Sequence, residues 1–232
     1  MTTRRITALL LSAMLCFSAA SCSDKEKGPS SSAAKTSAPP KVESGVGELI
    51  TPAEEDVDSG LGSYRMSEYG TKLYYDSSVF SDELALSLDK YFKSIHDEDY
   101  ETYKSCLFPS YLNNMETYLQ KDFQYGMDTS FSNQCARLKA LAAENYTITR
   151  IKIDKPQAEE GASTEEDYFS SFFGKLGECF GTDYYQEVKD NTDKLNEVNF
   201  TIMAEFDGAE TVILSDMKIV VAEKDGVFYN FG

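Results

Sequence analysis

Two Asp-Gly pairs constrain the fold of this chain more than any other feature. Asp207-Gly208 and Asp225-Gly226 separate three runs of mostly apolar and β-branched residues, at about 198–206, 211–222 and 227–231. An Asp-Gly pair tolerates the positive φ angles that a tight two-residue hairpin requires. We therefore expect the chain to end in three consecutive antiparallel strands.

The part before these strands has mostly helical spacing. Apolar residues at steps of three and four predict a helix over about 82–96, with Ser81 as its cap and acids in its first turn. Further helices are predicted through Tyr100, Tyr103 and Leu107; from Tyr111 to Phe123, closed by Gly126; over about 132–144 with Cys135, Leu138 and Leu141 inward; from a Ser163-x-x-Glu166 capping box to Phe180; and, more weakly, from Tyr184 to Leu195.

Alternating β-branched residues predict one more strand, at 146–154. The Gly-punctuated, Tyr-rich stretch before the first helix is expected to be irregular with a short strand around 72–75. Helices followed by consecutive antiparallel strands are typical of an α+β domain. We expect several N-terminal helices packed on one face of a mainly antiparallel C-terminal sheet of about four strands.

The N-terminus has the pattern of an exported bacterial lipoprotein. Residues 1–21 combine Arg4 and Arg5 with an apolar run too short to span a bilayer comfortably, which is typical of a signal peptide. The sequence Ala19-Ala20-Ser21-Cys22 resembles a lipobox, which makes Cys22 the expected lipidated residue. Cleavage after the small residues without lipidation is the alternative.

The segment 22–60 is rich in Ser, Ala, Pro, Gly and charge and has no apolar periodicity, so we expect a disordered tether there and a single folded domain over 61–232. Membrane attachment through Cys22 would place that domain on the extracytoplasmic face of a bacterial membrane.

The charge of the chain excludes several function classes. The formal net charge is −17, and removal of residues 1–21 would take away two arginines and no acid, giving −19. Such a surface argues against nucleic acid as a partner, because binding to phosphate needs clustered cations. It also disfavours flat contact with an anionic membrane, so the lipid would have to anchor the protein.

Metal and redox chemistry have little support. A single His cannot form a multi-His metal site, and no Cys-x-x-Cys pair is present, so we predict neither metal nor cofactor. Cys106, Cys135 and Cys179 lie in helical apolar patterns and are expected to be buried thiols, although one disulfide between two of them stays possible in principle.

Two segments resemble a known family. ALSLDKYFKSIHDEDYETYKSCLFPSYL is similar to the opening helices of nuclear-transport-factor-2-like (SnoaL-like, cystatin-like) domains, and VILSDMKIVVAEKDGVFYNFG is similar to their closing hairpin. The resemblance implies a strongly curved sheet that wraps around the helices as a cone with an apolar pocket. It also implies either a non-catalytic module, as in many bacterial lipoproteins of this kind, or an enzyme using polar side chains inside the cone.

The aromatic residues are the candidates for a ligand pocket. Six on predicted inward faces could line a site for a small apolar or carbohydrate-like ligand: Tyr91, Phe92, Tyr118, Phe123, Phe169 and Phe173. Packing in the core, in place of Leu and Trp, is the preferred interpretation of these residues. His96, next to Asp97 and near Asp99, is a conceivable acid–base group, but its place at a helix end favours a structural role.

The leading functional hypothesis is a lipid-anchored, extracytoplasmic, non-enzymatic module that binds a small ligand or an envelope protein. The alternative is an enzyme acting on an extracellular small molecule through Tyr and Asp side chains.

Overall fold

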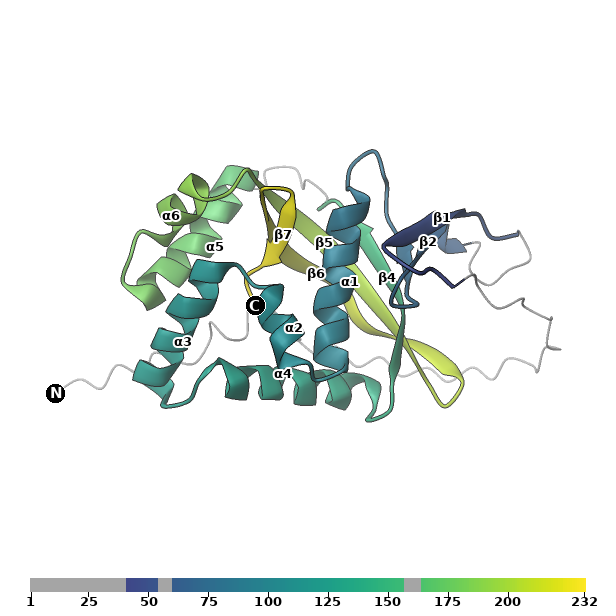
Figure 1. Ribbon diagram of the computed structural model, residues 1–232, viewed down its shortest axis with the longest axis horizontal. Coiled ribbons are helices and arrows are strands. Elements are labelled where there is room, and N and C mark those ends of the chain that lie inside the picture. Colours follow the sequence, from purple (N-terminus) through teal and green to yellow (C-terminus); the bar gives the residue numbers. More distant parts are fainter. Residues whose placement is uncertain (1–40, 54–59, 157–163) are drawn as a thin grey trace. The chain divides into compact units, whose positions relative to one another are not determined.

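The computed structural model describes residues 41–53, 60–156 and 164–232. The predicted signal peptide, Cys22 and Ser163 lie outside the described residues. Within them, six helices and seven strands form one α+β unit (Figure 1). In chain order they are β1 Val46–Ile50, β2 Tyr64–Ser67, β3 Lys72–Tyr74, α1 Asp82–His96, α2 Tyr100–Ser105, α3 Pro109–Phe123, α4 Met127–Ala142, β4 Thr147–Asp154, α5 Glu165–Phe180, α6 Tyr184–Asp190, β5 Lys194–Phe206, β6 Ala209–Lys224 and β7 Val227–Asn230.

The sheet is larger than the four strands expected. All seven strands pair in the order β1 to β7, and every neighbouring pair is antiparallel except β3 and β4, which are parallel. The α+β class is confirmed. The strongly curved cone was wrong, because the sheet is open, with β1 and β7 at opposite edges (Figure 1).

The main error of the sequence prediction concerns the strands at the N-terminal edge of the sheet. β1 lies inside the segment predicted to be tether, and β2 was not predicted at all. Both strands are too short and too irregular in composition to be recognised from the sequence. They are stabilised by pairing with each other and, through β3, with a strand far along the chain.

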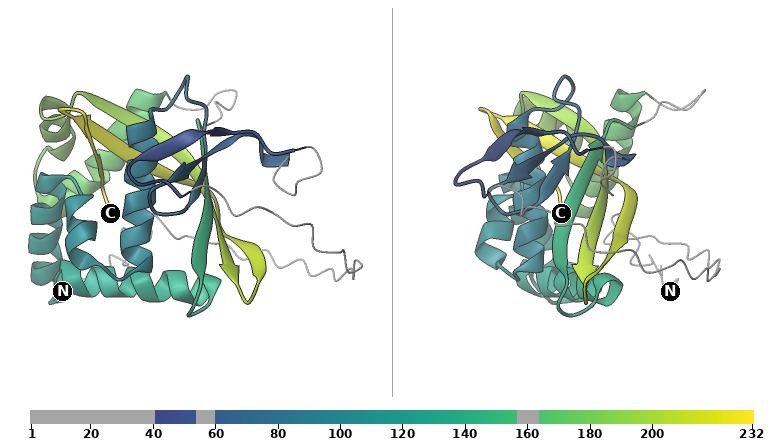
Figure 2. Two further views of the ribbon diagram at one scale, coloured as in Figure 1. Left: turned by 45° about the vertical axis from the view of Figure 1, so that its right-hand side comes forward. Right: turned by 90° about the vertical axis from the view of Figure 1, so that its right-hand side faces the viewer.

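One buried row shows how the sheet is held together. Register aligns Leu73 of β3, Ile151 of β4, Ile202 of β5 and Leu214 of β6, and all four side chains are buried. Helix α1 covers this face, with the ring of Phe92 at 4.8 Å from that of Phe200 in β5. The helices α1 to α3 lie on that side of the strands (Figure 2).

Local signals placed most helices and turns correctly. Helix α1 occupies the predicted residues, and the Ser81 side chain accepts from Leu84 N as its cap. Both Asp-Gly pairs have positive φ at each residue, as the hairpins require. The capping box of α5 uses Thr164 and Asp167, one residue beyond the predicted pair.

Three helices have boundaries that differ from the prediction. Helix α3 ends at Phe123, followed by Gln124 as its C-cap with a φ of 62°, and Gly126 is the N-cap of α4 instead of the end of α3. Helix α4 therefore begins at Met127, earlier than the predicted 132, and Leu141 is exposed instead of inward. Likewise α6 stops at Asp190 and Leu195 belongs to β5.

Candidate functional site

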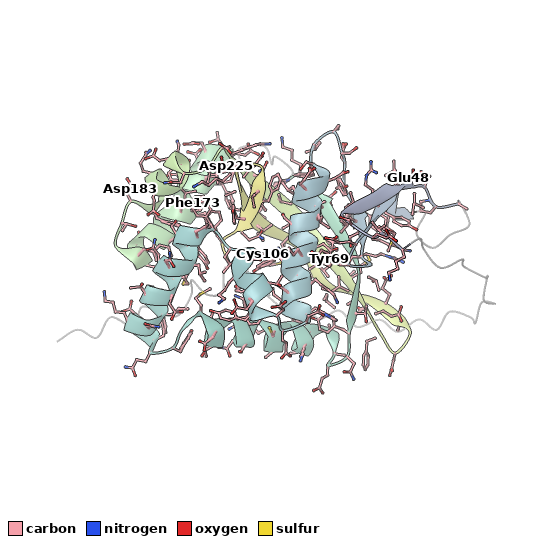
Figure 3. All side chains as sticks on the ribbon, in the orientation of Figure 1. Glu48, Tyr69, Cys106, Phe173, Asp183 and Asp225 are labelled. Carbon is pink, nitrogen blue, oxygen red and sulfur yellow. The ribbon has the colours of Figure 1, made fainter. Side chains whose placement is uncertain are left out.

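The six aromatic residues proposed as a pocket lining lie in three separate groups. Tyr91 and Phe92 of α1 are buried, with Phe92 against the sheet, and their ring centroids are 5.1 Å apart. Phe169 and Phe173 of α5 are also buried, and the side chain of Phe173 packs 4.8 Å from Phe231 (Figure 3).

The remaining two, Tyr118 and Phe123, form a partly exposed pair on α3, with ring centroids 5.6 Å apart. None of the six lines the groove described below.

His96 joins two elements of the fold. Its Nε2 lies 2.7 Å from the carbonyl oxygen of Tyr146, and its Nδ1 lies 2.5 Å from the carboxylate of Asp97. Burial tends to raise the pKa of Asp97, but hydrogen bonds from Lys93 and His96 outweigh it and lower that pKa. Asp99 caps α2 through Thr102 N. These contacts give His96 a structural role between α1 and the start of β4.

The three cysteines in the described part of the chain are free thiols. Cys106 and Cys135 are buried, and burial raises the pKa of Cys106 and brings that of Cys135 to about 11. A thiol of this kind carries little thiolate at neutral pH and is a poor nucleophile.

The described residues contain neither a metal-ligating cluster nor a membrane-spanning helix. No group of three His, Cys, Asp or Glu side chains is placed to hold a metal ion within residues 41–53, 60–156 and 164–232. No helix in these ranges has the length and apolar character needed to cross a bilayer.

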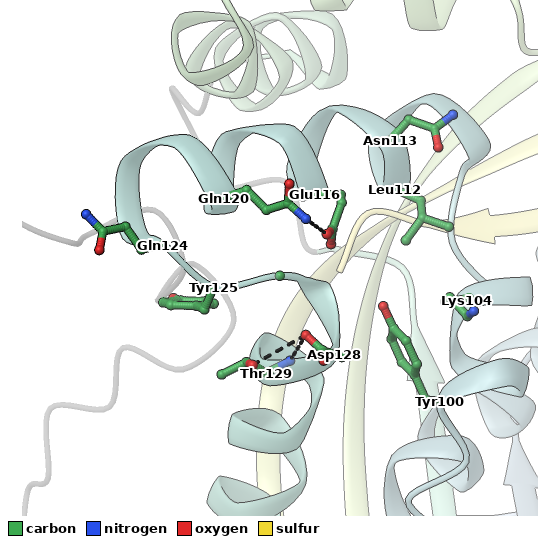
Figure 4. A pocket seen from close by; sticks show the side chains of 11 residues that line it. Tyr100, Lys104, Leu112, Asn113, Glu116, Gln120, Gln124, Tyr125, Asp128 and Thr129 are labelled. Carbon is green, nitrogen blue, oxygen red and sulfur yellow. Dashed lines mark hydrogen bonds between the residues drawn. The ribbon is translucent and has the colours of Figure 1, made fainter.

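A groove of about 660 Å³ lies between α2, α3 and the start of α4 (Figure 4). Its walls carry two tyrosines, two carboxylates and several amide side chains, with a single aliphatic residue. The lining residues are Tyr100, Lys104, Leu112, Asn113, Glu116, Gln120, Gln124, Tyr125, Gly126, Asp128 and Thr129.

Glu116 explains why the groove exists where it does. The N-cap of helix α4 is Gly126, which has no side chain to cap the helix, and the carboxylate of Glu116 reaches across from α3 to accept from Met127 N at 2.6 Å. Its other oxygen accepts from Gln120 Nε2. A side chain on Gly126 would collide with the carboxylate, since a Cβ there would lie 2.8 Å from Glu116 Oε1. Glycine at 126 thus leaves the Glu116 carboxylate room to reach Met127 N.

Tyr100 points from α2 toward the opposite wall (Figure 4). Partial burial is the main cause of its raised pKa, with the charges of Glu116 and Asp128 adding to the shift and Lys104 opposing it. The Lys104 ammonium lies 4.7 Å above the Tyr100 ring and pairs at 2.8 Å with Glu101.

The groove combines partly buried aromatic rings with side chains that can both donate and accept hydrogen bonds. Such a surface suits a ligand with alternating apolar faces and hydroxyl groups. Sequence reasoning missed it because its residues lie on the polar sides of helices α2 and α3 and in the connection from α3 to α4. Only tertiary packing brings them together.

A second polar feature was also missed, inside the core. Asp89 lies on α1 within the apolar stripe and is fully buried against the β2–β3 turn. Neither carboxylate oxygen of Asp89 accepts a well-aligned hydrogen bond. The pKa of Asp89 is lowered by the hydroxyls of Ser67 and Thr71 and by the ammonium of Lys93. Burial outweighs them and raises the pKa to about 6. The sequence signal for burial of Asp89 is its spacing within the helix, three residues before Phe92 and four residues after Ala85.

Comparison with known proteins adds no family: no family model, no curated protein and no solved structure matches the chain. The resemblance to nuclear-transport-factor-2-like domains therefore stays an expectation from the sequence.

Proposed function

We propose that this protein is a lipid-anchored, extracytoplasmic binding module whose groove between α2, α3 and α4 takes a carbohydrate. The observation that carries the proposal is the groove itself, where Tyr100 and Tyr125 accompany a wall of amide and carboxylate side chains. Pyranose rings present an apolar face to aromatic side chains and a rim of hydroxyls to amides and carboxylates. Sugars of the cell envelope are available where a lipid on Cys22 would hold the domain.

The internal apolar pocket expected from the sequence is a weaker basis for a ligand site than the groove. Four of the six aromatic residues expected to line it are packed in the core, which leaves them no free surface for a ligand. The groove instead lies on the helical part of the domain and uses other aromatic residues.

The groove is tested by removing its aromatic side chains. We expect Tyr100→Ala and Tyr125→Ala each to weaken binding of envelope-type oligosaccharides about tenfold, since each removes a large contact surface worth about 1–2 kcal/mol. Isothermal titration calorimetry measures the affinity. Tyr185→Ala, on α6 and outside the groove, is the matched control, and thermal unfolding checks the fold of all three. Unchanged affinity in both groove variants would remove this site from consideration.

The anchor is tested separately from the groove. Labelled palmitate should be incorporated by the wild-type chain and not by Cys22→Ser, because the thiol at 22 is the expected attachment atom. Equal labelling of the two would contradict the lipoprotein assignment, whatever the groove binds.

One observation favours the enzymatic alternative: the Tyr100 hydroxyl and the carboxylates of Glu116 and Asp128 share the groove. Two carboxylates are the usual machinery for glycoside hydrolysis. Release of new reducing ends from a bound oligosaccharide, lost in Glu116→Gln and Asp128→Asn, would establish an enzyme, whereas binding without release supports the module.

A further inference from the structure

The carboxylates of Glu116 and Asp128 both lie beside Gly126 in the lining of the groove. A Cβ built on Gly126 would lie 2.8 Å from Glu116 Oε1, 3.1 Å from Glu116 Oε2 and 3.1 Å from Asp128 Oδ1. Three oxygens from two carboxylates thus lie close together in the groove lining (Figure 4). Oxygens spaced this closely can share one donor group that carries several protons.

In the part of the chain that the structure describes, only neutral donors contact these oxygens. Glu116 accepts from Met127 N and from the amide of Gln120, and Asp128 accepts from the backbone and hydroxyl of Thr129. Neither carboxylate forms an ion pair with any residue in the described ranges 41–53, 60–156 and 164–232. Lys104, the cation in the groove lining, is held by Glu101 and the Tyr100 ring.

A neutral ligand would therefore displace water from two negative groups without supplying a compensating charge. Burying an ionised carboxylate is unfavourable unless it gains a charged or strongly donating partner. A ligand ammonium group would supply that partner through short charge-assisted hydrogen bonds.

We infer that the groove binds a carbohydrate carrying a primary ammonium group, which lies between Glu116 and Asp128 while the adjoining pyranose ring contacts Tyr100. The inference rests on the proposed function and narrows it to amino sugars with a free amine, such as β-1,4-linked glucosamine oligomers. Such a sugar matches both parts of the site, its aromatic wall and its two carboxylates.

A peptide lysine carries the same ammonium group but matches the rest of the groove less well. The lining comes from α2, α3, α4 and the connection between the last two, so it offers no strand edge on which an extended peptide could pair its backbone. Leu112 is the single aliphatic side chain of the lining, too little apolar surface for an amphipathic helix.

Three oligosaccharides that differ at one substituent test the inference. Tetramers of β-1,4-linked glucosamine, N-acetylglucosamine and glucose share one backbone and carry an ammonium, an acetamide or a hydroxyl at the same carbon. At mildly acidic pH, calorimetry should give an affinity for the glucosamine tetramer at least about tenfold higher than for the other two. Equal affinity for all three would overturn the ammonium inference and leave the proposed function standing, whereas no binding of any of them would count against both.

Charge variants separate the site from the general acidity of the protein. Glu116→Gln keeps an oxygen for Met127 N but loses the charge, so it should reduce the preference for glucosamine about tenfold with little change in melting temperature. Asp128→Asn should do the same. Asp122→Asn removes an equal charge from an exposed position on α3 outside the groove and should leave the preference intact.

Because the chain has a net charge of −17, any cationic ligand is attracted to some extent. An equal loss of glucosamine binding in Asp122→Asn would mean that the groove contributes nothing specific. If tetralysine competed as strongly as the glucosamine tetramer, the groove would recognise only the positive charge of its ligand. Either result would overturn the inference.

Discussion

At the scale of single residues, Asp89 is the most informative side chain. An acid at this position interrupts the apolar face of α1, and its full burial raises its pKa to about 6 from an ordinary value of 3.8. The neighbours that face it are the Ser67 and Thr71 hydroxyls and Glu68 from the β2–β3 turn, and Lys93 from its own helix. The folded protein therefore holds a proton on Asp89 more tightly than the unfolded chain does.

The sign of the pH effect follows from that shift. The contribution of protonated Asp89 is fully present below pH 3.8 and is lost as the pH rises through about 6. Above that pH the ionised group lowers the free energy of unfolding by on the order of 3 kcal/mol. Asp89→Asn, which is neutral at every pH, should stabilise the protein by up to about that amount at pH 7–8 and have little effect below about pH 4.

Urea denaturation of both proteins at several pH values measures this difference. Asp122→Asn, which removes an exposed carboxylate from α3, is the control. A stabilisation of Asp89→Asn that does not change with pH would contradict the assignment.

At the scale of helices and strands, the start of α4 depends on a residue of another helix. The cap on Met127 N is the carboxylate of Glu116, and a Cβ at residue 126 would lie 2.8 Å from that carboxylate, which would have to shift. The backbone at Gly126 has a φ of −101°, which any residue can adopt, so the effect of a side chain there comes from space and not from backbone conformation.

A double-mutant cycle tests this pair. Gly126→Ala should destabilise the protein by about 1–2 kcal/mol, because its Cβ displaces the carboxylate and uncaps the helix, and Glu116→Ala should cost about 1 kcal/mol by losing the same cap. Since Glu116→Ala also removes the collision, adding Gly126→Ala to it should cost little. Chemical denaturation gives the three values, and strictly additive costs would show that the two residues act independently.

At the scale of the whole domain, the strands before α1 belong to the same sheet as those after α4. Leu73 of β3 is fully buried in the row formed with Ile151 and Ile202. This row joins the two ends of the described chain across the parallel β3–β4 pair. We therefore expect one cooperative unfolding unit.

Truncation of Leu73 tests whether the domain unfolds as one cooperative unit. Leu73→Ala should lower the free energy of unfolding by about 2–4 kcal/mol, as expected for a buried leucine that leaves a cavity. Leu49→Ala in β1 removes an exposed side chain and should change it by less than about 0.5 kcal/mol. Thermal unfolding followed by circular dichroism and by tyrosine fluorescence should give one transition at one temperature, and two separate transitions would mean that β1 to β3 melt on their own.

The sequence by itself determined the features that depend on a few neighbouring residues. Helix α1 with its Ser81 cap, the two Asp-Gly hairpins and the α+β class all follow from spacing, capping and backbone preference within short segments. Tertiary structure alone decided which distant segments meet. It paired β3 with β4, placed Asp89 against Ser67 and Thr71, and brought Glu116 to Gly126 to form the groove. Each of these depends on packing and register between segments, and no local pattern of residues encodes which partner a segment will find.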